Sequence, residues 1–244
     1  MRLQTHLSQV TPFMRLDKLL SNSTGISRTE IKKAIKQGKA VVDGIVAKSG
    51  SAHVNTDQEI SLFGQAINEA SPRYFMLNKP EGVVSANRDA EHPTVLDLLI
   101  DEPMYEKLNI AGRLDIDTTG LVLLTDDGKW LHNITSPKKK CNKRYLATTK
   151  APIDPNSVAL FEQGIMLKDE LKPTHPAVLN ILTENTAELI ISEGRYHQVK
   201  RMFGATNNRV IALHRAAIGQ ITLDPDLLSG EYRPLTQAEI DSIK

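Results

Sequence analysis

Residues 111–125 read AGRLDIDTTGLVLLT and set one aspartate, Asp115, two positions after an arginine and shortly before an apolar run. The apolar residues 121–124 predict a buried strand, and the polar residues before them predict a loop that enters it. A carboxylate beside a rigid strand can act as a nucleophile toward a bound substrate. Arg113 can neutralise that carboxylate or hold a substrate phosphate. This stretch therefore predicts a reactive Asp115 on a fixed loop.

Strand and helix patterns follow one another irregularly around this stretch. Strands are expected at residues 73–77, 120–125, 145–149, 187–192 and 210–213, the first of them stopped by Asn78-Lys79-Pro80. Helices are expected at residues 94–99, 129–134, 157–163 and 196–203. Because the pattern does not alternate regularly, it predicts an α+β fold with a mixed, mainly antiparallel sheet flanked by helices.

The segment before this region carries the signals of a small separate unit. Ser27 and Glu30 have the spacing of a capping box, which predicts a helix that runs to about Gln37. Asp43-Gly44 between two short apolar stretches predicts a two-residue hairpin. Basic residues recur at fourfold spacing along the helix and form a ridge that a polyanion could meet, although a solvated helix face has the same pattern. The ridge consists of Arg28, Lys32 and Lys36.

Composition bounds the class of protein. The 244 residues suffice for two packed domains, and a net charge of +1 argues against a protein that coats nucleic acid indiscriminately. The single cysteine, Cys141, excludes an internal disulfide and favours the reducing cytoplasm, and no apolar run is long enough to cross a membrane. Met14 begins the first confident pattern and is the expected functional start. The expected organisation is a tail at 1–13, a small domain at 14–66, a linker at 67–72 and a larger domain at 73–244.

A second cluster of positive charge lies beside Tyr145. Its cations could hold the phosphates that flank a bound nucleotide, which would make binding salt-dependent. Each lysine alone is also typical of a solvated loop and is expected to be dispensable singly. The cluster comprises Lys138, Lys139, Lys140, Lys143 and Arg144.

Two other classes of site share part of the Asp115 pattern. Asp115-Ile116-Asp117-Thr118-Thr119 fits the D-x-D-x-T motif of aspartyl-phosphate phosphatases, but residues 109–114 are too polar and glycine-broken for the strand that those enzymes place before the first aspartate. A calcium loop would begin in the same way, yet Asp126 stands where its final glutamate is expected. Asp117 is better interpreted as a turn residue, and no histidine spacing predicts a metal site.

Four clusters together resemble a known family. They are Asn78-Lys79-Pro80, GRLD at residues 112–115, Lys143-Arg144-Tyr145-Leu146 and EGRYHQVKRMF at residues 193–203. These clusters resemble the motifs of the RNA pseudouridine synthases, and the order RLDKLL…SR…IKKAIKQGKAVVDGIVAK before them resembles the N-terminal S4 RNA-binding domain of one branch. The resemblance covers nearly the whole chain from Met14 onward and is strongest to the branch that modifies small-subunit (16S) ribosomal RNA.

The resemblance implies roles for individual residues. Asp115 would be the essential carboxylate in the isomerisation of uridine to pseudouridine, with Lys200 as its ion-pair partner. Tyr145 would stack on the base and exchange a proton. Weaker candidates for phosphate contacts are Arg113, Lys79 and Arg195.

The resemblance also implies how the protein works in the cell. It implies no metal and no organic cofactor, a target uridine that is flipped out of folded RNA, and a cytoplasmic monomer without membrane contact. Ribosomal RNA or a precursor small ribosomal subunit is the expected partner, and position 516 of 16S rRNA is the favoured target. A large-subunit (23S) rRNA enzyme and a non-catalytic rRNA-binding assembly factor are the alternatives. The motifs leave open whether Asp115 adds to uracil C6 or acts at ribose C1′.

Overall fold

The computed structural model describes residues 14–55, 57–67 and 72–243. The chain divides into two compact units, residues 1–71 and residues 72–244. The expected tail at residues 1–13, on which the proposed start at Met14 depends, lies outside the described residues, as do residues 68–71 of the expected linker. None of the described helices is both long enough and apolar enough to cross a bilayer.

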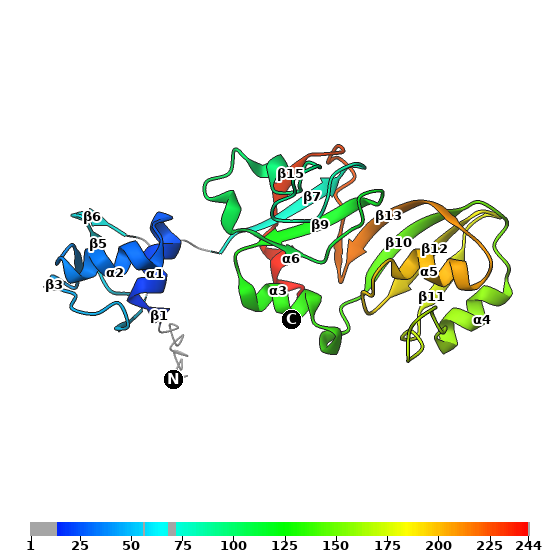
Figure 1. The fold of residues 1–244 in the computed structure, drawn as a ribbon, viewed down its shortest axis with the longest axis horizontal. Helices are drawn as coiled ribbons and strands as arrows, with labels where there is room; N and C mark the ends of the chain where they lie inside the picture. The colour runs from blue at the N-terminus through cyan, green and yellow to red at the C-terminus, as the bar shows by residue number, and fades with distance from the viewer. Residues whose placement is uncertain (1–13, 56, 68–71, 244) are drawn as a thin grey trace, which may run out of the picture. The chain divides into compact units, whose positions relative to one another are not determined.

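The first unit packs two helices against short strands (Figure 1). Its elements are β1 (Met14–Arg15), α1 (Leu16–Thr24), α2 (Arg28–Lys36), β2 (Ala40–Val42), β3 (Ile45–Val46), β4 (His53–Val54), β5 (Ile60–Leu62) and β6 (Gln65–Ala66). Strand β1 pairs with β4, and the others form a sheet in the order β3-β2-β5-β6. One face of each helix supplies the core, with Leu16 and Leu20 from α1 and Ile31 and Ile35 from α2.

Both local signals of this unit are confirmed. The Ser27 hydroxyl accepts a hydrogen bond from the Glu30 amide, and the Glu30 carboxylate accepts one from the Ser27 amide, which is the capping box that starts α2. Asp43 and Gly44 have φ values of 49° and 77° and join β2 to β3 as a hairpin. Helix α1 lacks such a signal, since its N-cap residue Arg15 makes no side-chain capping bond, and the sequence patterns do not predict it.

The second unit is built on a nine-stranded sheet with a main path in the order β11-β12-β10-β13-β9-β7-β15, to which β8 adds at β9 and β14 at β13. The strands are β7 (Tyr74–Lys79), β8 (Asn109–Ala111), β9 (Thr119–Thr125), β10 (Lys143–Thr149), β11 (Val178–Ile181), β12 (Thr186–Ile191), β13 (Val210–Ile218), β14 (Ile221–Thr222) and β15 (Tyr232–Pro234). Strands β9 and β13 run parallel, whereas the other pairs within the sheet are antiparallel. The expected α+β fold with a mixed, mainly antiparallel sheet is confirmed.

Helices cover both faces of this sheet (Figure 1). They are α3 (Gly128–Thr135), α4 (Asn156–Gln163), α5 (Gln198–Ala205) and α6 (Gln237–Asp241), with single 3₁₀ turns at Asp97–Leu99, Tyr105–Lys107 and Pro137–Lys139. Val122 and Leu124 of β9 belong to the core cluster that includes α4 and α5 side chains, while Leu121 and Leu123 belong to the cluster that includes α3. Alternate residues of β9 thus enter two cores, which explains its continuous apolar run.

Several elements differ from the sequence-based expectation. Strand β7 continues through Asn78 and Lys79 before Pro80 ends it, and the helix expected at residues 94–99 is only a 3₁₀ turn at Asp97–Leu99. The segment Asn109–Ala111 forms a strand, β8, that the sequence patterns do not predict, although it ends before Gly112 and does not lead directly to Asp115. It is short because Gly112, with φ 91°, turns the chain away from β9.

Candidate active site

Asp115 lies on the loop from β8 to β9, and a buried lysine fixes one side of that loop. Lys79, at the end of β7, is fully buried. Its ammonium donates hydrogen bonds to the carbonyl oxygens of Ile116 and Thr118 at 3.3 and 2.8 Å, and to that of Pro80 at 2.9 Å. Burial lowers the pKa of Lys79 to about 8. The expected contact of Lys79 with a substrate phosphate is therefore wrong, because the loop that Lys79 holds encloses its ammonium group.

A second buried cation, Arg215, fixes the other side of the loop. It lies in β13 with 1% of its surface exposed. Its guanidinium donates to the carbonyl oxygens of Gly112 and Leu121, each at 2.8 Å, and to that of Arg113 at 3.3 Å. The same group lies 3.4 Å from the Tyr145 hydroxyl. The sequence patterns do not single out Arg215, since they end this strand at residue 213.

A glycine lets the strand that carries Arg215 approach the loop. In the parallel pair of β9 with β13, Gly120 stands opposite Arg215. Gly120 has a φ of 102°, and a Cβ atom there would lie 2.5 Å from the Arg215 carbonyl oxygen. Any other side chain would push the two strands apart. Gly120 therefore helps to hold the Asp115 loop in position.

Helix α5 brings a lysine to Asp115. Lys200 Nζ lies 3.0 Å from Asp115 Oδ2 and 2.5 Å from Asp117 Oδ1, so one ammonium joins two carboxylates. On the residue before the helix, His197 Nε2 lies 3.5 Å from Asp115 Oδ1. The Asp115 side chain is 28% exposed and stays accessible to a substrate. The Asp117 carboxylate accepts a hydrogen bond from Lys200, and Asp117 lies within a turn that the bond from the Thr118 amide to the Asp115 carbonyl closes.

Lys200 and Asp117 hold their charges at neutral pH. Burial alone would lower the pKa of Lys200, but the hydrogen bonds from Lys200 to Asp117 and Asp115 outweigh it and raise that pKa above its ordinary value. The hydrogen bond from Lys200 in turn lowers the pKa of Asp117. The cation at this site therefore offsets the cost of partly burying two carboxylates.

A pocket of about 870 Å³ opens beside Asp115. Asp115, Lys200 and Tyr145 line it together, although they come from a loop, a helix and a strand. Tyr145 is 8% exposed and pairs with Arg215 in the register of β10 with β13. The three residues expected to act in catalysis thus share one cavity, and Arg215 and His197 also line it.

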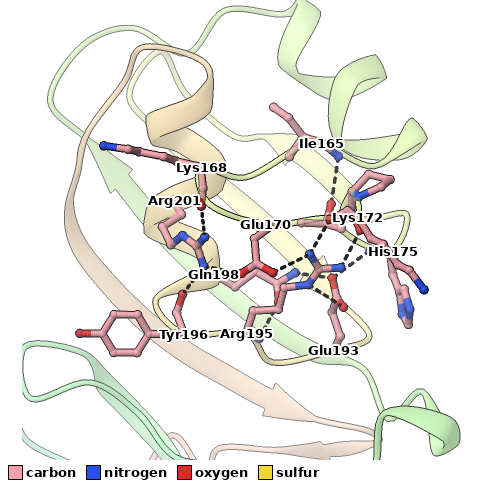
Figure 2. Close-up of polar contacts among 12 residues, drawn as sticks. Ile165, Lys168, Glu170, Lys172, His175, Glu193, Arg195, Tyr196, Gln198 and Arg201 are labelled. Carbon is pink, nitrogen blue, oxygen red and sulfur yellow. Dashed lines mark hydrogen bonds and ion pairs between the residues drawn. The ribbon is translucent and has the colours of Figure 1, made fainter.

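Arg195 also lines the pocket, but its guanidinium binds groups of the protein itself (Figure 2). It donates to the Glu193 carboxylate at 3.1 Å and to the carbonyl oxygens of Lys172 and Pro173 at 2.8 and 2.6 Å. Arg201 makes a similar set of bonds, to Glu170 at 2.9 Å and to the Lys168 carbonyl at 2.6 Å. These two arginines fasten the segment that leads into β11 to the segment that presents Lys200.

The other basic candidates of the second unit divide into accessible and enclosed groups. Arg113 is exposed at the edge of the pocket, and the three lysines at residues 138–140 are exposed next to α3. Arg144 lies 3.7 Å from Glu188. Lys143 is buried and donates to the carbonyl oxygens of Ile134 and Cys141 at 3.2 and 2.7 Å, and burial lowers its pKa. Lys143 also lines the pocket, so its expected phosphate contact stays a prediction, although its ammonium already donates to these two carbonyl groups.

The basic ridge of the first unit is anchored by an aspartate. Asp17 is fully buried, with Arg28 at 2.6 Å, Arg15 at 2.8 Å and Lys32 at 3.8 Å from its carboxylate. The three cations keep between 43 and 54% of their side chains exposed. Lys36, the third member of the ridge, is exposed on the same helix. The ridge residues Arg28, Lys32 and Lys36 can therefore all reach a ligand in solution.

No group of three or more acidic, histidine or cysteine side chains suited to a metal ion occurs among the residues that the structure describes. Residues 121–124, which a calcium loop would need, form the centre of β9. Lys200 occupies the space between the two carboxylates of the D-x-D-x-T pattern, where a phosphatase would hold magnesium.

The sequence of the second unit matches a known family model. Residues 73–205 match the model described as RNA pseudouridylate synthase, and residues 14–60 match the S4 domain. The chain belongs to the RNA pseudouridylate synthase family. As a member of this family the protein is an isomerase that forms pseudouridine in RNA, and the four motif clusters all fall within the matched region.

Relatives of the same length support the family assignment. The ribosomal small subunit pseudouridine synthase A of Yersinia pestis is 51% identical over 94% of this chain and 98% of its own length. The protein of that name from Escherichia coli strain K12 is 49% identical over 94% of this chain and its entire length. A crystal structure of a pseudouridylate synthase, 48% identical, covers 95% of this chain with a TM-score of 0.69. The resemblance seen in the sequence motifs is confirmed.

Proposed function

We propose that this protein converts one uridine of small-subunit (16S) ribosomal RNA into pseudouridine, with position 516 as the site. Relatives named for the small ribosomal subunit, which align over 94% of the chain at 49 to 51% identity, support the choice of subunit. The resemblance to that branch is what favours the position. The S4 domain match and the exposed basic ridge support RNA as the ligand of the first unit.

One observation supports the chemistry above all others. Asp115 is ion-paired with Lys200 at 3.0 Å, remains 28% exposed and lines a pocket that also holds Tyr145. An ionised carboxylate at the wall of a cavity that can hold a nucleoside is suited to attack that nucleoside. Lys79 and Arg215 hold the loop from both sides, so the carboxylate is positioned before the substrate arrives.

The reaction rearranges atoms within the nucleoside. The bond from ribose C1′ to uracil N1 breaks, uracil rotates, and a bond from C1′ to C5 forms, while the C5 proton leaves and N1 gains a proton. Asp115 serves either by adding to uracil C6 or by acting at ribose C1′, and both routes need the same ionised oxygen. Tyr145 stacks on the base, and its hydroxyl, bonded to Arg215, exchanges the C5 proton. The balance is complete without an oxidant, a reductant or a second substrate, so the proposal includes no metal or cofactor.

RNA has to be unstacked for this chemistry. A base that is stacked in an RNA helix cannot reach Asp115 in its pocket, so the target uridine is flipped out of the folded RNA. Arg113 at the pocket edge, the lysines at residues 138–140 and the ridge of α2 would hold the surrounding phosphates. We further propose that the enzyme acts as a monomer in the cytoplasm, where ribosomal RNA is assembled, on naked RNA or on a precursor particle.

The test of this proposal is a map of pseudouridines. Ribosomal RNA from cells that lack the protein should miss one pseudouridine of 16S rRNA, at position 516, and regain it when the wild-type gene is returned. Loss of a pseudouridine from 23S rRNA instead would assign the protein to the large subunit. An unchanged map would favour the non-catalytic assembly factor.

A further inference from the structure

A large aromatic ring is exposed at the edge of the proposed active site. Tyr196 leaves 76% of its surface exposed, although both Tyr196 and His197 line the pocket. Its ring stacks on the His197 ring with 3.7 Å between centroids and 21° between planes. One face of the tyrosine is therefore covered by the histidine, and most of the rest is open to solvent.

The backbone below this ring is fixed by a dense set of polar contacts. Arg201 Nη1 donates to the Tyr196 carbonyl oxygen at 3.1 Å, and the Arg195 amide donates to Gln198 Oε1 at 2.9 Å. The side-chain amide of the buried Gln198 in turn donates to the Glu193 carboxylate at 3.0 Å. Figure 2 shows the Tyr196 ring pointing away from this network while its carbonyl points into it. The ring is thus held ready for a ligand and loses little freedom when one binds.

The histidine places this ring close to the reactive carboxylate. His197 Nε2 lies 3.5 Å from Asp115 Oδ1, and His197 adopts a left-handed backbone conformation with φ 47° at the start of α5. The rings of Tyr196 and His197 thus form a stack that begins beside Asp115 and ends in solvent. When a nucleotide is flipped toward Asp115, the nucleotides next to it in the RNA come close to the same wall of the pocket.

We propose that Tyr196 is a stacking platform for an unpaired base adjacent to the target uridine. The inference rests on the proposed function, since it takes RNA as the ligand of this pocket. Aromatic rings bind the flat faces of unstacked bases, and every base offers such a face, so the platform serves whichever nucleotide flanks the uridine. The platform would compensate part of the stacking that the flanking base loses when the uridine leaves the helix. Tyr196 contributes to RNA affinity and has no part in the chemical step.

The experiment compares three variants on a 16S rRNA fragment with 2-aminopurine beside the target uridine. Tyr196→Ala removes the ring, Tyr196→Leu keeps apolar bulk without a π face, and Tyr196→Phe keeps the ring without the hydroxyl. The alanine and leucine variants should raise the Kd for the fragment roughly 5- to 150-fold, and the phenylalanine variant should match wild type. The single-turnover rate at saturating RNA should be unchanged in all three, and thermal melting checks that each is folded.

The fluorescence of the 2-aminopurine reports the contact directly. Binding to wild type and Tyr196→Phe should quench it more than binding to Tyr196→Leu. Equal Kd and equal quenching for wild type and the leucine variant would overturn the stacking role, as would a loss confined to the rate at saturating RNA. Wild type that binds the fragment and quenches its fluorescence without making pseudouridine would overturn the proposed function and leave the stacking role standing.

Discussion

Each of the two units has an aspartate that is ion-paired with cations, but the two sites expose different groups to the solvent. Asp17 of the first unit is fully buried, and its carboxylate contacts Arg15, Arg28 and Lys32. Hydrogen bonds from Arg15, followed by Arg28, lower the pKa of Asp17 to about 2 against the opposing effect of burial. Its carboxylate is enclosed while the cations around it remain exposed, so this site offers positive charge to the solvent.

Asp115 of the second unit is arranged differently, since its carboxylate is as accessible as the cation that it pairs with. Its carboxylate is 28% exposed, while its partner Lys200 is 24% exposed and shared with Asp117. The loop that carries Asp115 is held through backbone carbonyl groups by Lys79 and Arg215, so these two cations do not cover the carboxylate, which stays partly accessible to a substrate. The difference shows that a nearby cation does not by itself define a functional carboxylate. What distinguishes Asp115 is access from a pocket together with a fixed backbone.

Removal of Lys200 should have the largest effect among the groups around the two aspartates. Lys200→Met leaves Asp115 and Asp117 without their shared cation, which removes the ion pair at the reactive carboxylate and loosens the reactive geometry. We expect the single-turnover rate to fall about 10²- to 10³-fold. Lys200→Arg, which keeps the charge, should recover part of the rate. A wild-type rate in Lys200→Met would show that Asp115 acts without its ion pair.

The pH dependence of this pair has a defined direction. Because folding raises the pKa of Lys200, the pair stabilises the protein fully below the unfolded lysine value of about 10.5 and weakens as the pH rises through the folded value. The rate of the wild-type enzyme should therefore show no loss from Lys200 deprotonation between pH 7 and about pH 9.

Replacement of Asp17 should weaken the first unit without touching the chemistry. Asp17→Asn removes the charge that Arg15 and Arg28 surround, and we expect the first unit to lose about 1–3 kcal/mol of unfolding free energy. RNA affinity should fall because the ridge loses its anchor, while the single-turnover rate at saturating RNA stays at the wild-type value. Glu59→Gln, an exposed acid in the same unit, is the matched control. A lower rate at saturating RNA would mean that Asp17 is not confined to a structural role.

Acid should remove the contribution of Asp17 in a defined window. Since folding lowers its pKa to about 2, the stabilisation is present above the unfolded value of about 4 and is lost as the pH falls toward 2. Asp17→Asn should lack this part of the acid transition, as measured by urea unfolding at stepped pH.

Exchange of the exposed lysines next to α3 should have the smallest effect. Single changes of Lys138, Lys139 or Lys140 to Gln should alter RNA affinity little. The triple variant should reduce the slope of log affinity against log salt by up to about 2, because a protein releases about 0.7 counterions for each phosphate of a single strand that it neutralises. An unchanged slope would show that these lysines do not bind the RNA phosphates.

Local sequence signals predicted much of the fold, whereas contacts between segments far apart in the chain could not be predicted from them. The capping box at Ser27 and the Asp43-Gly44 hairpin depend on neighbouring residues alone, and both form as expected. Strand β8 depends on its partner β9, and its polar start and the glycine after it hide that pairing from any local pattern. Burial of Lys79 likewise depends on carbonyl groups of a loop about 40 positions further along the chain.

Site residues that belong to a sequence motif could be predicted. Residues whose role at the site follows from the packing of distant strands could not. The sequence motifs point to Asp115, Tyr145 and Lys200, and the structure brings these into one pocket. Arg215 has no local signal, because its role follows from the register of β13 beside both β9 and β10. Lys143 stands within a basic run but is buried, because alternate residues of β10 are buried and Lys143 shares that face with Tyr145.

The central claim is that an accessible, fixed Asp115 performs the chemistry and that RNA binding is separate from it. The most direct measurement quantifies pseudouridine in 16S rRNA, or in a precursor small-subunit particle, after incubation with wild type or Asp115→Asn, together with the Kd of each protein for the same RNA. We predict that wild type forms one pseudouridine, whereas Asp115→Asn binds with a similar Kd and forms none. Equal product from both proteins would contradict the account.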